Sequence, residues 1–124
     1  MSMADAREAL LAPEVQAIAR RAPERVALIL PKAGSATRVD IVTYGSLARS
    51  LDAYAAGLVR RGLQRGDRVL LLMPLSADLF ALALAVFALG ATVVFLDGSL
   101  SPRRVAHALR IAQPRVVVST RRAL

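Results

Sequence analysis

The chain has 124 residues, which allows one domain with a substantial hydrophobic core and excludes two. It contains no cysteine, which excludes a disulfide framework and thiolate metal sites. The formal net charge is +8, and the apolar share of 56% comes largely from Ala, Leu and Val, which suits close packing of helices on a sheet.

The amino-terminal third of the chain predicts a helix followed by a β-hairpin. The first residues lack a basic start followed by an apolar stretch, so no signal peptide is expected and cytoplasmic residence is predicted. An amphipathic helix is expected over Glu14–Arg21, with Pro13 tolerated in its opening turn and Pro23 stopping it. Strands are expected over Val26–Leu30 and Arg38–Val42, joined by a loose turn into a hairpin.

The clearest helical pattern in the chain covers Tyr44–Arg61. Its apolar positions are spaced four, three and four residues apart, which is one stripe of a 3.6-residue period. The stripe consists of Leu47, Leu51, Tyr54 and Leu58. Thr43 can cap the start of this helix and Gly62 can end it, so the stripe is expected to face the core.

The segment Arg68–Asp97 carries a single internal charge and has two interpretations. Leu79–Leu96 has 18 residues without a charge, which is the lower limit for crossing a bilayer. Internal signals favour strand, helix and strand instead. Pro74 ends a short apolar run, Ser76 can cap a helix, and Gly90 can end that helix before a β-branched stretch. We therefore predict a βαβ unit in place of a transmembrane span.

The last part of the chain adds another helix and another strand. Ser101 and Pro102 suit the start of a helix that runs to about Ala112, and Arg115–Ser119 suits a strand. The side chains expected to be buried on that helix are Val105, Leu109 and Ala112. The order β, α, β, α, β from Arg68 onward predicts an α/β fold in three layers, with a mostly parallel sheet and right-handed helical crossovers. We expect one unit over residues 1–124, with its core at about residues 20–120.

Few side chains are candidates for catalysis or metal binding. His107 is the only histidine, and it lies three or four residues from three arginines, so a solvated surface side chain is expected. Ser76, Ser101 and Thr43 are better explained as helix caps than as nucleophiles, because none has an evident base partner. Lys32 lies in a turn without the glycine cluster of a phosphate loop.

No phosphate cradle or dinucleotide fingerprint is visible in the sequence. The seven glycines are scattered, and the strand–helix junctions hold only Gly98. We therefore assign no catalytic, cofactor-binding or metal-binding residue to this chain. No acidic residue follows Asp97, so the arginines beyond it are unbalanced, as on a surface for nucleic acid or for an acidic partner. Nucleic acid is disfavoured, because no aromatic residues are interleaved with these arginines.

Four segments follow one another in a specific order. They are Arg21–Leu28 (RAPERVAL), Val42–Leu47 (VTYGSL), Gly62–Val69 (GLQRGDRV) and Leu89–Asp97 (LGATVVFLD). They resemble the P-x-x-x-A, T-Y-x-E-L, G-L-x-x-G-D-R-V and K-A-G-A-x-x-V-P-L-D patterns in the N-terminal part of the AMP-forming acyl-CoA synthetase superfamily, the adenylate-forming ligases. The resemblance covers about residues 20–120.

The chain departs from the family pattern at several positions. Ser46 stands where the family usually has Glu, which weakens the reciprocal capping box. Leu89 replaces a basic residue, and Phe95 and Gly98 replace prolines around Asp97. With the very apolar helix before it, the segment around Asp97 looks closest to the ligases for fatty acids.

The resemblance implies the fold of the N-terminal subdomain of an adenylate-forming ligase. For the parent enzyme it implies ATP, Mg²⁺ and CoA: a carboxylate attacks the α-phosphate of ATP to give an acyl-adenylate, and a thiol then displaces AMP. The family's Ser/Thr/Gly-rich phosphate loop should lie further along than Leu124. No catalytic or binding residue, and no cofactor, can therefore be carried over to this chain.

We therefore predict that the chain is the N-terminal structural portion of an ATP-dependent, AMP-forming carboxylic acid–CoA (fatty-acid) ligase and is inactive by itself. Its expected partner is the remainder of the parent ligase, and an exposed sheet edge or apolar face would also allow a homo-oligomer. Two alternatives stay open. One is a stand-alone basic α/β module that binds nucleic acid or an acidic protein, and the other is a small membrane protein that spans at Leu79–Leu96.

Overall fold

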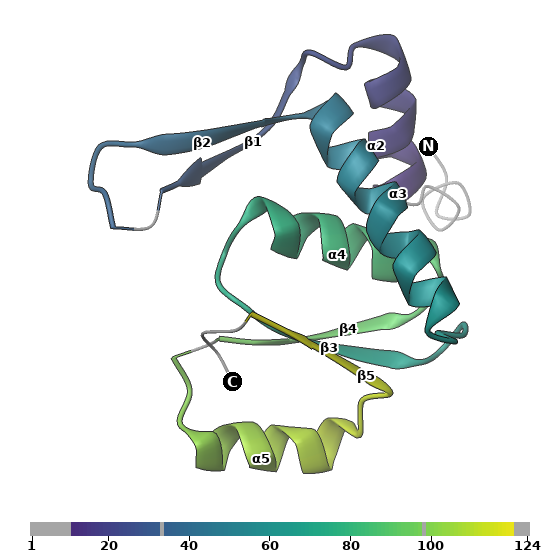
Figure 1. The fold of residues 1–124 in the computed structure, drawn as a ribbon, viewed down its shortest axis with the longest axis vertical. Helices are drawn as coiled ribbons and strands as arrows, with labels where there is room; N and C mark the ends of the chain where they lie inside the picture. Colours follow the sequence, from purple (N-terminus) through teal and green to yellow (C-terminus); the bar gives the residue numbers. More distant parts are fainter. Residues whose placement is uncertain (1–10, 33, 98, 121–124) are drawn as a thin grey trace, which may run out of the picture.

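The computed structural model describes residues 11–32, 34–97 and 99–120 (Figure 1). The elements are, in chain order, α2 (Leu11–Arg21), β1 (Val26–Pro31), β2 (Val39–Thr43), α3 (Tyr44–Arg60), β3 (Arg68–Leu72), α4 (Ala77–Ala88), β4 (Thr92–Leu96), α5 (Pro102–Ala112) and β5 (Val116–Ser119). The strands form an antiparallel β1–β2 ribbon and a three-stranded sheet in the order β4-β3-β5.

The three-stranded sheet is parallel throughout. Its central strand is β3, in which Leu70 lies opposite Val94 of β4 on one side and Val117 of β5 on the other. The helix α4 covers one face of this sheet, with α3 beyond it, and α5 lies on the opposite face (Figure 1). The predicted α/β fold in three layers with helical crossovers is therefore confirmed. No helix in the described ranges has the length and apolar character needed to cross a bilayer.

Burial of Val69–Leu72 explains the uninterrupted apolar sequence of β3 after Arg68. Val69, Leu70 and Leu71 have no exposed surface, because the strand has neighbours at both edges and helices on both faces. On the α4 side, Val69 and Leu71 join one hydrophobic cluster with Leu82 and Val86. At about 25 cal/mol per Å² of apolar area removed from water, such side chains supply most of the driving force for folding.

The helix α4 is buried from two sides, which explains why the chain has a long stretch without charges. One of its faces packs on the sheet through Leu82 and Val86, and the other contributes Ala81 and Leu84 to a second cluster. That second cluster also contains side chains of α2 and α3, namely Ala12, Val15, Leu47 and Leu51. A helix that is apolar all round is therefore a core helix here, placed between the sheet and the α2–α3 pair.

Several element boundaries differ from the sequence-based expectation, most of them by a single residue. The helix α2 (Leu11–Arg21) includes the three residues before Glu14, and Pro13 lies near the beginning of its described part. The strand β1 extends through Pro31, which pairs with Val39 at the end of the ribbon. Proline is tolerated there because both strands of a two-stranded ribbon are edge strands.

The expectation that α5 buries Val105, Leu109 and Ala112 was wrong about how deeply these side chains are buried. These side chains are only half-buried, and α5 contains no buried residue. In Figure 1, α5 is the one described helix on its face of the sheet, whereas α4 has α3 beside it. Helical periodicity identifies the side that faces the sheet, but the depth of burial depends on neighbours that the periodicity does not specify.

Candidate functional site

A groove of about 330 Å³ lies between α3 and β5. One wall is formed by α3, part of the floor by Leu82 of α4, and the other wall by β5. The residues of α3 that line it are Ala53, Tyr54, Gly57 and Leu58, and Arg61, directly after α3, lines it too. Because β5 is the last strand in the order β4-β3-β5, the groove follows an edge of the sheet. We call this hollow the α3–β5 groove.

Tyr54 supplies the strongest polar contact beside the α3–β5 groove. Its hydroxyl donates a hydrogen bond of 2.7 Å to Oδ1 of Asp78, in the first turn of α4. This hydrogen bond, together with burial and the negative charge of Asp78, raises the pKa of Tyr54 to about 12. The phenol therefore stays neutral at physiological pH, which suits a structural link between α3 and α4 better than an acid or a nucleophile.

Sequence reasoning missed this contact. It placed Tyr54 in an apolar stripe and treated Asp78 as the single internal charge of the segment Arg68–Asp97. The two residues are 24 positions apart, so no local pattern relates them. The available signal was the polar tip of an otherwise apolar side chain, which usually has a hydrogen-bond partner when the ring is buried.

The carboxyl ends of β3 and β5 form the second place where a site could be expected. The connection after β3 crosses one face of the sheet and the connection after β4 crosses the other, and open α/β sheets bind ligands where such connections diverge. Ser76 and Ser119 lie there. The hydroxyl of Ser76 accepts a hydrogen bond from the Leu79 N–H at 3.2 Å, and the hydroxyl of Ser119 donates to the Thr120 carbonyl at 3.1 Å. Both hydroxyls therefore satisfy nearby backbone groups.

The three hydroxyl residues considered as nucleophiles are helix caps, as predicted. Thr43, Ser76 and Ser101 each accept a hydrogen bond from a backbone N–H three residues later, at 3.2, 3.2 and 3.4 Å. They stand at the starts of α3, α4 and α5, so they belong to three different helix ends. Their chemistry is the satisfaction of helix N–H groups that would otherwise lack partners.

The other candidate residues that the structure describes, His107 and Lys32, do not line the α3–β5 groove either. His107 is exposed on α5, as expected, and Lys32 lies in a turn, where its N–H donates to the Arg38 carbonyl at 3.0 Å. Gly98, considered for phosphate binding, lies outside the described residues. Within the described ranges, no three His, Asp or Glu side chains are grouped so that they could hold a metal ion. That the chain carries no catalytic, cofactor or metal residue stays a prediction.

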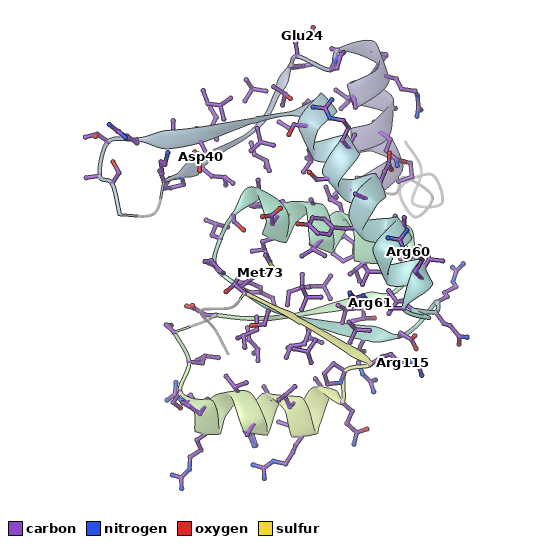
Figure 2. All side chains as sticks on the ribbon, in the orientation of Figure 1. Glu24, Asp40, Arg60, Arg61, Met73 and Arg115 are labelled. Atoms are coloured by element: carbon purple, nitrogen blue, oxygen red, sulfur yellow. The ribbon has the colours of Figure 1, made fainter. Side chains whose placement is uncertain are left out.

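The helix α5 and the residue before β5 carry exposed arginines. Arg103, Arg104 and Arg110 are exposed on this helix, and Arg115 follows it just before β5. Arg121 and Arg122, which were expected to extend this basic surface, lie outside the described residues. Figure 2 places Arg61 and Arg115 at one end of the sheet and Met73 at the other.

A second hollow lies between α2 and α3 and is more polar. Its lining includes Arg20 and Arg49, together with Gln16 and Asp52. The side-chain amide of Gln16 donates a hydrogen bond of 2.7 Å to Oδ1 of Asp52. This contact ties α2 to α3 on the surface and needs no ligand to explain it.

The family model described as AMP-binding enzyme matches residues 15–124. The chain is 30% identical over 112 residues to an olefin beta-lactone synthetase of Xanthomonas campestris pv. campestris, covering 87% of this chain and 20% of that protein. It is 35% identical over 100 residues to the human acetyl-coenzyme A synthetase 2-like, mitochondrial, covering 81% of this chain and 14% of that protein. The chain thus spans about a fifth or less of the length of these relatives.

Similarity to solved structures points to the same part of such proteins. The N-terminal subdomain of NpsA from Klebsiella oxytoca, in complex with 3-hydroxyanthranilyl-AMSN, superposes with a TM-score of 0.74 at 29% sequence identity. The match covers 89% of this chain and 26% of that chain. The described fold therefore matches the N-terminal subdomain of an adenylate-forming enzyme.

Proposed function

The chain belongs to the family of AMP-binding enzymes, and from this membership we propose that it is the N-terminal structural portion of an ATP-dependent, AMP-forming carboxylic acid–CoA ligase. The observation that carries this proposal is the fold match over 89% of the chain to the N-terminal subdomain of NpsA. The similarity to an acetyl-coenzyme A synthetase supports CoA as the acceptor. The fatty-acid branch is favoured by the segment Phe95–Gly98 and by the very apolar α4 before it.

The proposed role is that of a scaffold. The strand β3 is buried from Val69 to Leu72, and α4 packs between the sheet and the α2–α3 pair, so these elements form a rigid support. The family reaction requires phosphate contacts and a Mg²⁺ site that are held in fixed positions. In this chain the best-placed hydroxyls serve as helix caps. We therefore place the phosphate loop and the acid pocket in the remainder of the parent ligase.

A pyrophosphate assay tests this proposal directly. The purified chain is mixed with ATP, Mg²⁺, CoA and a panel of short-, medium- and long-chain carboxylic acids, with a complete acyl-CoA synthetase as positive control. We expect no pyrophosphate release above the buffer rate. Robust release by the chain alone would refute the scaffold role.

The coding sequence beyond the codon for Leu124 provides an independent test. We expect a Ser/Thr/Gly-rich loop that ends in Pro-Lys-Gly, and a product of that longer frame should form CoA thioesters with long-chain acids faster than with acetate. A preference for acetate would remove the fatty-acid assignment and keep the ligase assignment. A stop codon at this point would contradict the parent ligase.

The exposed arginines of α5 favour a second candidate, a basic module that binds nucleic acid or an acidic protein. Because phosphate contacts release counterions, such binding would weaken steeply as the salt concentration rises. A gel-shift titration with labelled nucleic acid at physiological ionic strength tests it, with the doubly substituted variant Arg103→Ala, Arg104→Ala as comparison. A shift that this variant weakens would support the candidate, and no shift at micromolar chain would exclude nucleic acid.

A further inference from the structure

One side of α5 combines basic side chains with an exposed apolar one. At about 3.6 residues per turn, the exposed residues of this side share an arc of about 120°, and they are Arg103, Arg104, His107, Arg110 and Ile111. On the opposite side lie the half-buried Val105, Leu109 and Ala112. The helix contains no acidic residue, and Asp97, the last one before it, accepts the N–H of Ser99 at 3.0 Å. We call the exposed side the α5 basic face.

Two arginines of the α5 basic face stand where cations do not favour a helix. Arg103 and Arg104 occupy the first turn, at the positive end of the helix dipole. The hydroxyl of the N-cap Ser101 accepts the N–H of Arg104 at 3.4 Å, which makes Arg104 the third helical residue. A Glu at that position would bond back to the cap and complete a capping box. The helix therefore carries cations where anions would stabilise it, which indicates that they serve a contact outside the chain.

We propose that the α5 basic face binds an acidic amphipathic helix of another protein. The proposal rests on the second candidate function, a basic module, and names its partner. Carboxylates three or four residues apart on such a helix would lie opposite the guanidinium groups, over the ~12 Å of α5 between Arg103 and Ile111. Guanidinium–carboxylate pairs can form two parallel hydrogen bonds, so they orient the partner as well as attract it. The net charge of +8 favours the approach of such a partner.

Ile111 favours a protein over nucleic acid as the partner. It is 71% exposed directly after Arg110, so the α5 basic face ends in an apolar side chain. Protein interfaces combine arginine with apolar side chains that become buried, and an apolar residue of an amphipathic helix could cover Ile111. Nucleic acid would use the cations and leave Ile111 in water. Neither α5 nor β5 contains an aromatic residue on which a base could stack.

A labelled peptide measures the proposed binding directly. The probe is a fluorescent alanine-rich helix with glutamate at every third or fourth position along one side and a leucine at one end of that side. The control peptide has the same residues in an order that spreads glutamate around the helix, so both carry the same charge. We expect the patterned peptide to bind about tenfold more tightly in anisotropy titrations at physiological ionic strength. Equal affinity for the two peptides would overturn the proposal, because charge alone would explain it.

Paired substitutions of equal charge locate the binding surface. Arg103→Ala with Arg110→Ala removes two cations from the α5 basic face, and Arg20→Ala with Arg49→Ala removes two exposed cations from α2 and α3. We expect the first pair to weaken binding of the patterned peptide about tenfold and the second pair less than about twofold. Ile111→Ser should also weaken it, because the apolar contact is lost. Equal losses from the two pairs, or unchanged affinity of Ile111→Ser, would overturn the proposal.

The variant Arg104→Glu separates the stability of α5 from its binding. It completes a capping box with Ser101 and places an anion at the positive end of the helix dipole. We expect the thermal midpoint to rise by a few degrees while binding of the patterned peptide is lost. Circular dichroism follows both the fold and the midpoint. A lower midpoint would overturn the inference that these arginines are placed at the expense of stability.

The gel-shift titration separates the partner from the candidate function on which it rests. Nucleic acid that binds more tightly than the patterned peptide would overturn the protein partner and keep the basic module. Absence of binding by both probes would overturn the partner and the basic module together. The pyrophosphate assay tests the scaffold role independently of these outcomes.

Discussion

The hydrogen bond between Tyr54 and Asp78 should make stability fall at alkaline pH. Folding raises the pKa of Tyr54 from its ordinary value of 10.0 to about 12, mainly through this bond. Because the folded-state pKa is the higher one, folding favours the neutral phenol. The stabilisation is complete below pH 10 and is lost as the pH rises through 12. Replacement of Tyr54 by Phe removes both the bond and this part of the pH dependence.

The size of the effect follows from the pKa and from the position of the bond. A change of pKa from 10.0 to about 12 corresponds to about 3 kcal/mol if the interaction is unscreened. The bond is accessible to solvent, so screening reduces this value. A hydrogen bond to a charged group typically contributes about 1.5–3 kcal/mol when it is well buried. We therefore expect Tyr54→Phe to lower the free energy of unfolding by about 1 kcal/mol at pH 8.

Urea unfolding followed by circular dichroism measures this effect. Unmodified chain, Tyr54→Phe and Tyr44→Phe are compared from pH 8 to pH 12, and Tyr44→Phe controls for loss of the other phenol. The difference between the unmodified chain and Tyr54→Phe should shrink toward zero as the pH approaches 12. Asp78→Asn keeps an acceptor oxygen but removes the charge, so it should move this loss to lower pH. A difference that stays constant between pH 9 and 12 would refute the reasoning.

Four further substitutions test the packing and one helix cap. Gly45→Ala should destabilise the fold by about 1–3 kcal/mol, because the added Cβ atom would lie 3.0 Å from Pro23. Gly57→Ala in the same helix should stabilise the fold by up to about 1 kcal/mol. If thermal unfolding showed that both substitutions shift the stability in the same direction, the close approach at Gly45 would be contradicted. Leu51→Ala empties a site that is 1% exposed and should cost about 2–5 kcal/mol in urea unfolding, and a cost below 1 kcal/mol would count against a packed second cluster. Ser76→Ala should cost about 1 kcal/mol and increase amide hydrogen exchange at the start of α4, while unchanged exchange there would argue against the cap.

Elements determined by short-range signals could be predicted from the sequence. A cap and its helix involve residues three apart, so Thr43, Ser76 and Ser101 located the starts of α3, α4 and α5. The parallel pairing of β3 and β4 also followed, because a strand, a short helix and a second strand allow few other arrangements. The motif order identified the family for the same reason, since it depends on contiguous segments.

Features that depend on the approach of distant segments could not be predicted. The contact between Tyr54 and Asp78 joins two helices whose relative rotation no periodicity specifies. The α3–β5 groove requires α3 and β5 to lie side by side, although more than 50 residues separate Arg60 from Val116. The shallow burial of α5 depends on what lies beside it on the sheet. Local sequence patterns contain none of this information.

The position of β3 in the sheet has a consequence for synthesis on the ribosome. It is the middle strand, yet it is translated before either of its neighbours. Ser119, the last residue of β5, is made 47 residues after Leu72, the last residue of β3, which at roughly 5–20 residues per second takes about 2–9 s. During that interval β3, whose residues Val69, Leu70 and Leu71 are fully buried in the complete fold, lacks β5 as its second neighbour. Nascent chains arrested within this window should therefore be the ones that recruit cotranslational chaperones most strongly.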